Sequence, residues 1–129
     1  MPLFRLNRSL AFPPPDLAEP EGLLAIGGDL SVARLRRAYA SGIFPWYSEG
    51  DPLLWWSPDP RYLLFPAELK VAKSMRPLLN RPRFEVTFDR RFDEVLQACA
   101  TAPRPGAEGT WITPDMAAAY HRLHVAGYA

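Results

Sequence analysis

The stretch that decides this fold is rich in tryptophan and proline, and it reads Ile43-Phe44-Pro45-Trp46-Tyr47-Ser48-Glu49-Gly50-Asp51-Pro52-Leu53-Leu54-Trp55-Trp56-Ser57-Pro58-Asp59-Pro60-Arg61. Three of the chain's four tryptophans fall within eleven of these residues, and four prolines are set among them. Tryptophan is large and flat, and its indole N–H needs a partner when buried. Proline fixes φ and removes a backbone donor. The composition therefore predicts stiff backbone holding flat aromatic faces, either to stack a planar ligand such as a nucleobase or to build a small irregular core.

The composition of the whole chain is that of a globular protein. It has 129 residues, of which 48% are hydrophobic and 22% charged. The formal net charge is +1, so any nucleic-acid binding would have to come from local patches. No run approaches the roughly 18 apolar residues of a membrane span, and the start does not resemble a signal peptide. A single cysteine allows no internal disulfide, and together these features favour a cytoplasmic setting.

Local signals predict the elements that precede the tryptophan-rich stretch. The proline-rich residues 12–22 are expected to be an extended lead-in. Ser31 is a good helix cap, and the apolar residues between 32 and 39 recur at helical spacing. They predict a helix that starts after Ser31 and is closed by Gly42 as its C-cap. The arginines of this segment are expected off the apolar face of the helix: Arg34, Arg36 and Arg37.

After the tryptophan-rich stretch, short strands and helices alternate. Strands are expected over 62–65, 69–71 and 84–88. Ser74 is expected to cap a short helix with Pro77 in its first turn, and residues 90–100 form a helix with Cys99 on its packed side.

The last predicted helix begins at Thr113-Pro114-Asp115 and ends at Gly127, with an apolar stripe of Met116, Tyr120 and Leu123. These elements lack the regular rhythm of a parallel α/β sheet. The predicted fold class is therefore α+β.

Several residues could carry function. The segment from Lys70 to Arg83 holds five cations and no acid, which suits either a solvated face or contacts with phosphates. Trp111 lies just before the last helix, either as a hydrophobic staple or as a second stacking face. His121 and His124 are interpreted as polar-face residues, because the sequence offers no completing set of metal ligands, and Cys99 is interpreted as inert. No metal and no organic cofactor are expected.

Five ordered motifs resemble the bacterial leucyl/phenylalanyl-tRNA–protein transferases along nearly the whole chain. They occupy residues 20–30 (Pro-Glu-Gly-Leu-Leu-Ala-Ile-Gly-Gly-Asp-Leu), 42–48 (Gly-Ile-Phe-Pro-Trp-Tyr-Ser), 54–61 (Leu-Trp-Trp-Ser-Pro-Asp-Pro-Arg), 109–113 (Gly-Thr-Trp-Ile-Thr) and 119–124 (Ala-Tyr-His-Arg-Leu-His). The resemblance implies an enzyme that moves leucine or phenylalanine from aminoacyl-tRNA to the N-terminal arginine or lysine of acceptor proteins. The product is marked for degradation by the N-end rule.

The resemblance also implies a domain division. A small N-terminal α+β domain over residues 1–108 would precede a GNAT-like acyltransferase domain that begins at 109–129 and is truncated here. The family's catalytic carboxylate and amide lie in the part that this chain lacks. No catalytic residue is therefore assigned, and the chain alone is expected to be inactive or nearly so.

The resemblance assigns binding roles by position. Trp46 and Trp111 match tryptophans that line the site for the terminal aminoacyl-adenosine, and Tyr39 matches a tyrosine near that site. Lys73 and Arg76 match a basic helix that meets the tRNA acceptor stem. Arg81 and Arg83 are expected to compensate for non-basic neighbours in that helix.

Two alternatives remain beside the enzyme. The chain could be a non-enzymatic module whose aromatic groove binds nucleic acid or a proline-rich peptide. It could also be a folding domain in which every tryptophan belongs to the core.

Overall fold

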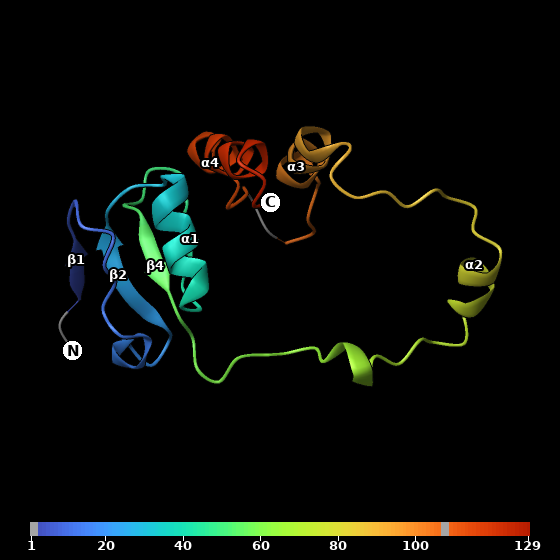
Figure 1. Ribbon diagram of the computed structural model, residues 1–129, viewed down its shortest axis with the longest axis horizontal. Helices are drawn as coiled ribbons and strands as arrows, with labels where there is room; N and C mark the ends of the chain where they lie inside the picture. The colour runs from blue at the N-terminus through green and yellow to red at the C-terminus, as the bar shows by residue number, and fades with distance from the viewer. Residues whose placement is uncertain (1–2, 107–108) are drawn as a thin grey trace. The chain divides into compact units, whose positions relative to one another are not determined.

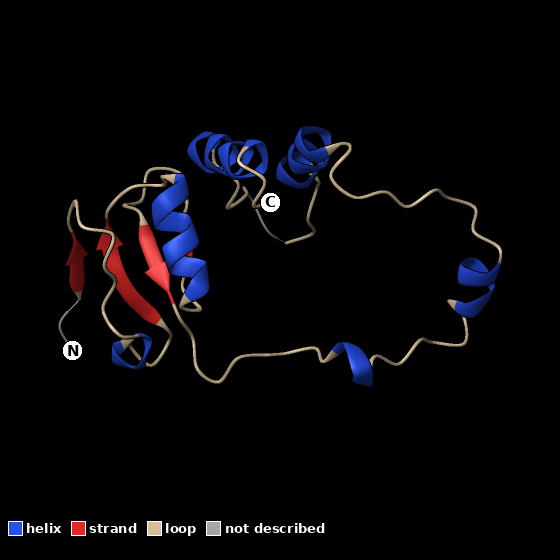
Figure 2. Ribbon diagram, in the orientation of Figure 1, coloured by secondary structure: helices blue, strands red, loops and turns tan. Residues whose placement is uncertain are grey.

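The computed structural model describes residues 3–106 and 109–129. The chain divides into two compact units, residues 1–59 with 91–129 and residues 60–90. The first unit holds a four-stranded sheet with the helices α1 (Val32–Ala40), α3 (Phe92–Thr101) and α4 (Pro114–Val125), as Figures 1 and 2 show. These helices and the small mixed sheet confirm the α+β prediction.

The sheet is built from very short strands in the order β1-β2-β4-β3. The strands are β1 (Phe4–Leu6), β2 (Leu23–Gly27), β3 (Phe44–Pro45) and β4 (Leu54–Trp56). β1 pairs with β2 in parallel, whereas β2–β4 and β3–β4 are antiparallel. The tryptophan-rich stretch thus supplies two adjacent strands, which the sequence patterns did not predict. The expected extended lead-in contains a single 3₁₀ turn, η1 (Pro15–Leu17).

Trp55 is the largest fully buried side chain of the core. Its indole N–H donates to the carbonyl of Gly27 at 2.8 Å, which satisfies the polar end of the ring. The ring of Phe12 meets it edge-on, with centroids 4.9 Å apart. α1 and α4 complete this core, whose buried members are Leu24, Ala25, Leu35, Ala38, Ile43, Trp55, Ala119 and Leu123. The alternative in which all four tryptophans are core residues is wrong, because Trp46 and Trp111 are exposed.

The predicted N-terminal caps of α1 and α4 are confirmed. The hydroxyl of Ser31 accepts from the N–H of Arg34 at 3.3 Å, and that of Thr113 accepts from the N–H of Met116 at 3.2 Å. Gly42 follows α1 with a φ of 72°, a left-handed conformation that favours glycine, and so turns the chain toward β3.

Arg34 departs from its predicted place, because it is fully buried rather than off the apolar face of α1. Its guanidinium donates to the carbonyl of Asn7 at 2.7 Å and to the carboxylate of Asp29 at 3.2 Å. Its carbon Cζ lies 5.8 Å from the ring centroid of Phe12. Hydrogen bonding from Ser31, with a smaller contribution from Arg34, holds the pKa of Asp29 below its ordinary value.

The unit of residues 60–90 contains one 3₁₀ turn, η2 (Pro66–Glu68), and one short helix, α2 (Arg76–Asn80). The predicted strands over 62–65, 69–71 and 84–88 are wrong for this structure, since those residues are irregular and their apolar side chains are exposed. A strand is stable only beside a partner, and the described residues of this unit supply none. Pro77 lies in the first turn of α2 as predicted, but Ser74 is not its cap: the helix begins after Met75 without a side-chain cap.

α3 matches the helix predicted over 90–100 with a shift of one or two residues, but Cys99 is exposed rather than packed. α3 is held to α4 through its first turn. There His121 Nδ1 lies 2.7 Å from the carboxylate of Asp93, and the ring of His124 stacks on Phe92 with centroids 4.3 Å apart. The predicted domain boundary at residue 108 falls on residues 107–108, which lie outside the described residues.

The buried contacts of Arg34 give the first testable prediction. Arg34→Ala removes two hydrogen bonds and leaves a cavity, so the free energy of unfolding should fall by about 2–4 kcal/mol. Arg37→Ala is the matched control, because Arg37 is on the same helix and exposed, and it should change stability by less than about 0.5 kcal/mol. Urea unfolding followed by far-UV circular dichroism measures both. Equal stabilities of the two variants would contradict the role of Arg34.

Candidate functional site

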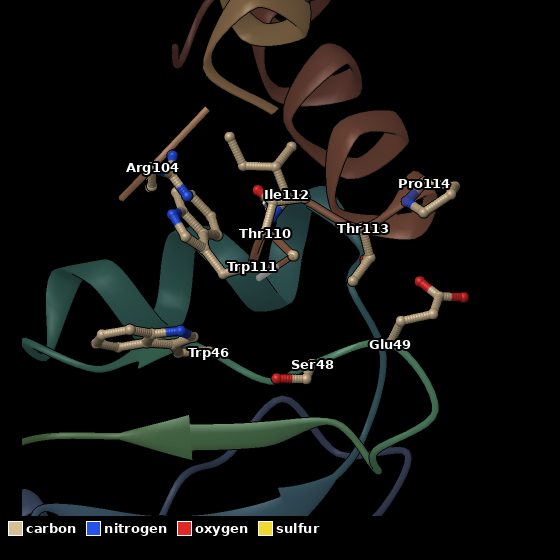
Figure 3. Close-up of a pocket in the computed structure, with 10 residues that line it drawn as sticks. Trp46, Ser48, Glu49, Arg104, Thr110, Trp111, Ile112, Thr113 and Pro114 are labelled. Atoms are coloured by element: carbon tan, nitrogen blue, oxygen red, sulfur yellow. Dashed lines mark hydrogen bonds between the residues drawn. The ribbon is translucent and has the colours of Figure 1, made fainter. Parts of the chain in front are cut away.

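Trp46 and Trp111 line the same cavity, although 64 residues separate them in the sequence. The cavity has a volume of about 500 Å³, and Figure 3 shows both rings at one side of it. The other residues that line it are Ser48, Glu49, Arg104, Gly109, Thr110, Ile112, Thr113 and Pro114. All belong to the first unit, so the cavity lies within one compact body.

The backbone of Trp46 is fixed on both sides. It follows β3 directly, and its N–H donates to the carbonyl of Leu54 at 3.0 Å. Its own carbonyl accepts from the indole N–H of Trp56 at 2.7 Å. The Trp46 side chain is nevertheless 56% exposed. A rigid backbone therefore holds an open indole face, which is what stacking on a planar group requires.

Trp111 is held by the start of α4. Ile112 and Thr113 are buried, and the hydroxyl of Thr110 accepts from the N–H of Ile112 at 3.1 Å. The Trp111 ring meets the ring of Tyr120 edge-on, with centroids 6.3 Å apart and an interplanar angle of 78°. The side chain still exposes 37% of its surface. Trp111 thus packs on its own helix, as a staple would, and also presents a face to the cavity.

Tyr120, whose ring meets Trp111, also makes a hydroxyl–hydroxyl contact with Tyr39. Their rings meet edge-on, with centroids 6.5 Å apart. Burial, and then the hydrogen bond with Tyr39, raises the pKa of Tyr120 above its ordinary value. Tyr39 itself does not line the cavity. It contacts Tyr120, which in turn contacts Trp111. The sequence pattern placed Tyr120 only in an apolar stripe, although its hydroxyl was a signal that this position needs a polar partner.

The predicted tRNA-contacting cations lie in the unit of residues 60–90. Lys73, Arg76, Arg81 and Arg83 are all exposed. Arg76 begins α2, and Lys73 lies in the turn that precedes it. The aromatic cavity belongs to the other unit.

Within the described ranges, no group of three or more His, Cys, Asp or Glu residues could hold a metal ion. His121 and His124 instead pack and bond against α3, as described above. The described part of the chain also contains no helix long and apolar enough to cross a membrane.

Comparison with known proteins identifies the family. Residues 28–59 match the model of the leucyl/phenylalanyl-tRNA protein transferase N-terminal domain, and residues 63–129 match the model named leucyl/phenylalanyl-tRNA protein transferase. The chain belongs to the leucyl/phenylalanyl-tRNA protein transferase family. Trp46 lies in the first matched region of this family and Trp111 in the second.

Curated leucyl/phenylalanyl-tRNA–protein transferases are similar along the chain. The one from Anaeromyxobacter sp. (strain Fw109-5) is 57% identical over 129 residues, which are 100% of this chain and 55% of that protein. The one from Syntrophobacter fumaroxidans is 58% identical with the same coverage. The one from Methylococcus capsulatus is 60% identical over 121 residues, which are 92% of this chain and 51% of that protein. The chain therefore spans about half the length of the curated relatives it matches.

The raised pKa of Tyr120 predicts how stability depends on pH. A phenol that ionises later in the folded state than in the unfolded state contributes stability below the unfolded pKa of about 10, and that contribution is lost as the pH rises further. As the pH rises from 8 to about 11, the free energy of unfolding should therefore fall less for Tyr120→Phe than for the wild type. Urea unfolding at several pH values measures this difference. Tyr62→Phe is the control, because Tyr62 is fully exposed, and a pH dependence identical in both variants would contradict the assignment.

Proposed function

We propose that this chain is part of an enzyme that transfers leucine or phenylalanine from aminoacyl-tRNA to the N-terminal arginine or lysine of acceptor proteins. The family match over residues 28–59 and 63–129 supports the reaction class. The single observation that carries the proposal within the structure is the cavity that Trp46 and Trp111 share. In this proposal the cavity receives the terminal aminoacyl-adenosine of the tRNA.

The cavity suits that ligand in size and surface. Two partly exposed indoles border a volume of about 500 Å³, which falls in the usual range for small-molecule sites. Every nucleobase has a π-face, so stacking on tryptophan needs no dedicated hydrogen bonds. The buried cap at Thr113 and the bonds around Trp46 hold the two walls in place.

The reaction requires mainly that the two substrates be positioned next to each other. The α-amine of the acceptor has a pKa of roughly 7.7–8 and attacks as the free base. A bond forms between its nitrogen and the aminoacyl carbonyl carbon, and the ester bond to the ribose oxygen breaks. The amine releases a proton, and the ribose hydroxyl gains one. Because the ester is already activated, holding the two substrates together supplies much of the rate.

The exposed cations of residues 60–90 are proposed to contact tRNA phosphates. Lys73, Arg76, Arg81 and Arg83 lie on this unit, and the ion pair described within it joins Arg90 to Glu85 instead. Such contacts release counterions from the nucleic acid, so they add affinity that depends on salt but not on sequence.

We propose, as the resemblance implies, that residues 1–108 form an N-terminal domain and that a GNAT-like domain begins at 109–129.

Stacking on the two indoles is tested with puromycin, an aminoacyl-adenosine analogue. Trp46→Ala and Trp111→Ala should each weaken its binding by about 1–3 kcal/mol, or roughly fivefold or more in Kd. The backbone bonds that fix residue 46 do not use its own side chain, so Trp46→Ala should keep the fold. Titration calorimetry gives the Kd values, and Tyr62→Ala is the control, an exposed aromatic outside the cavity. Unchanged affinity in both tryptophan variants would refute the assigned site.

Phosphate contacts are tested by the salt dependence of tRNA binding. The logarithm of the binding constant should fall linearly with the logarithm of salt concentration, and a Lys73→Ala/Arg76→Ala double variant should reduce that slope by about 2. Arg5→Ala/Arg8→Ala removes the same charge from exposed positions of the other unit and should keep the slope. If the Lys73→Ala/Arg76→Ala variant leaves the slope unchanged, these two side chains do not contact tRNA phosphates. Binding of a proline-rich peptide with none to tRNA would instead favour the non-enzymatic module.

A further inference from the structure

A second cavity adjoins the one described above, and the two differ in the charged side chains that line them. The second has a volume of about 470 Å³, and Trp46 and Ser48 line both cavities. Two acidic residues, Glu21 and Asp51, line the second cavity, and none of the described residues around it is basic. The first cavity is lined by Arg104. Of the two, the first is therefore the one that offers a positive charge to an anionic part of a ligand.

The guanidinium of Arg104 is anchored to α3, although the residue lies in the loop between α3 and α4. Its Nη2 donates to the carbonyl of Cys99 at 3.1 Å. Cys99 belongs to the last turn of α3, where the final carbonyls have no partner within the helix. The bond therefore serves the end of the helix, and it also fixes where the positive charge of the loop lies.

Arg104 keeps hydrogen-bond donors for a ligand. A guanidinium carries several N–H groups in one plane, and the bond to Cys99 uses the Nη2 end. The residue is exposed, and in the ranges 3–106 and 109–129 no ion pair involves it. The planar arrangement of donors matches two oxygens of one phosphate, which is why arginine suits phosphate recognition.

The acidic residue of the first cavity does not neutralise Arg104. That residue is Glu49, and Figure 3 shows it near Pro114, on the side of the cavity away from Arg104. In the same view Arg104 lies on the side where the indoles of Trp46 and Trp111 are drawn. No ion pair in the described part of the chain joins Arg104 to Glu49. The positive charge is thus located at the aromatic side of the cavity.

We propose that Arg104 binds the 5′-phosphate of the nucleotide whose base stacks on Trp46 and Trp111. The inference rests on the proposed function, in which that nucleotide is the terminal adenosine of an aminoacyl-tRNA. Stacking alone does not orient a nucleotide, because a base offers a π-face on either side. The phosphate is on the 5′ oxygen of the ribose and the aminoacyl ester is at the opposite, 3′ end. A contact between Arg104 and the phosphate therefore directs the ester away from Arg104.

Two ligands test the phosphate contact on the unmodified chain. Puromycin and puromycin 5′-monophosphate differ only in the phosphate. Calorimetry should show that the monophosphate binds at least about fivefold more tightly, and this gain should shrink as salt is added, because the contact is open to solvent. Equal affinity of the two ligands would overturn the proposal, and because no variant is needed, misfolding cannot explain that result.

A variant then tests the residue through the ratio of the two Kd values. Arg104→Gln should bring that ratio close to one. If Arg104 only held the end of α3, its loss would weaken both ligands alike and keep the ratio, and that result would overturn the proposal. Arg37→Gln is the matched control, because Arg37 is an exposed arginine of the same unit that does not line the cavity, and it should keep the wild-type ratio. An equal fall in both variants would mean general attraction between charges, and would also overturn the assignment.

The same measurements separate this inference from the proposed function. If the wild type binds neither ligand, the nucleotide site and the phosphate contact fall together. If it binds both ligands equally well, the phosphate contact falls alone and the stacking site stands. If it binds only the monophosphate, and Arg104→Gln abolishes that binding, the phosphate contact stands and stacking on the two indoles falls.

Discussion

The buried guanidinium of Arg34 is the constraint on which the first unit depends. A charge taken out of water is unfavourable unless hydrogen bonds and an opposite charge accompany it. Arg34 therefore requires the carbonyl of Asn7 and the carboxylate of Asp29 to stay together beside α1. Its Nη1 is buried without a hydrogen-bond partner among the described residues, and the nearby ring of Phe12 supplies a cation–π contact. Gly28 fits this arrangement because an added Cβ would lie 3.1 Å from Arg34 Nε.

That constraint is linked to the aromatic cavity through a short series of contacts. Phe12, which faces Arg34, also packs edge-on against Trp55, and Trp55 donates to the carbonyl of Gly27. Trp55 pairs with Pro45 across β3 and β4, so the residue that precedes Trp46 is fixed by the core. The open indole of Trp46 is thus one residue away from a buried strand. A stacking face is held rigid here by packing, which lowers the ordering cost of binding a flat ligand.

The features that sequence predicted well are those decided by neighbours in the chain. The helix caps at Ser31 and Thr113 need only a hydroxyl three residues before an N–H, and both formed. Burial of Arg34 could not be predicted, because its partner Asn7 lies 27 residues away and on the other side of β2 in sequence. The alternating residues 84–88 predicted a strand, but alternation fixes which face would be buried and cannot supply the partner. The motif resemblance predicted that Trp46 and Trp111 lie at one site, and they line one cavity. It did not predict that Tyr120 contacts both Trp111 and Tyr39, because the helical spacing of Tyr120 suits a core residue equally well.

The segment from Trp46 to Asp51 matters because it lines both cavities. Such a wall keeps one shape toward both cavities only if its backbone is rigid. The bonds of Trp46 with Leu54 and Trp56, and the turn from Ser48 to Asp51, provide that rigidity through the backbone. Each cavity also receives one carboxylate from this segment, Glu49 in the first and Asp51 in the second. Trp46 therefore contributes to both cavities, whereas Trp111 lines the first and Trp56 lines the second.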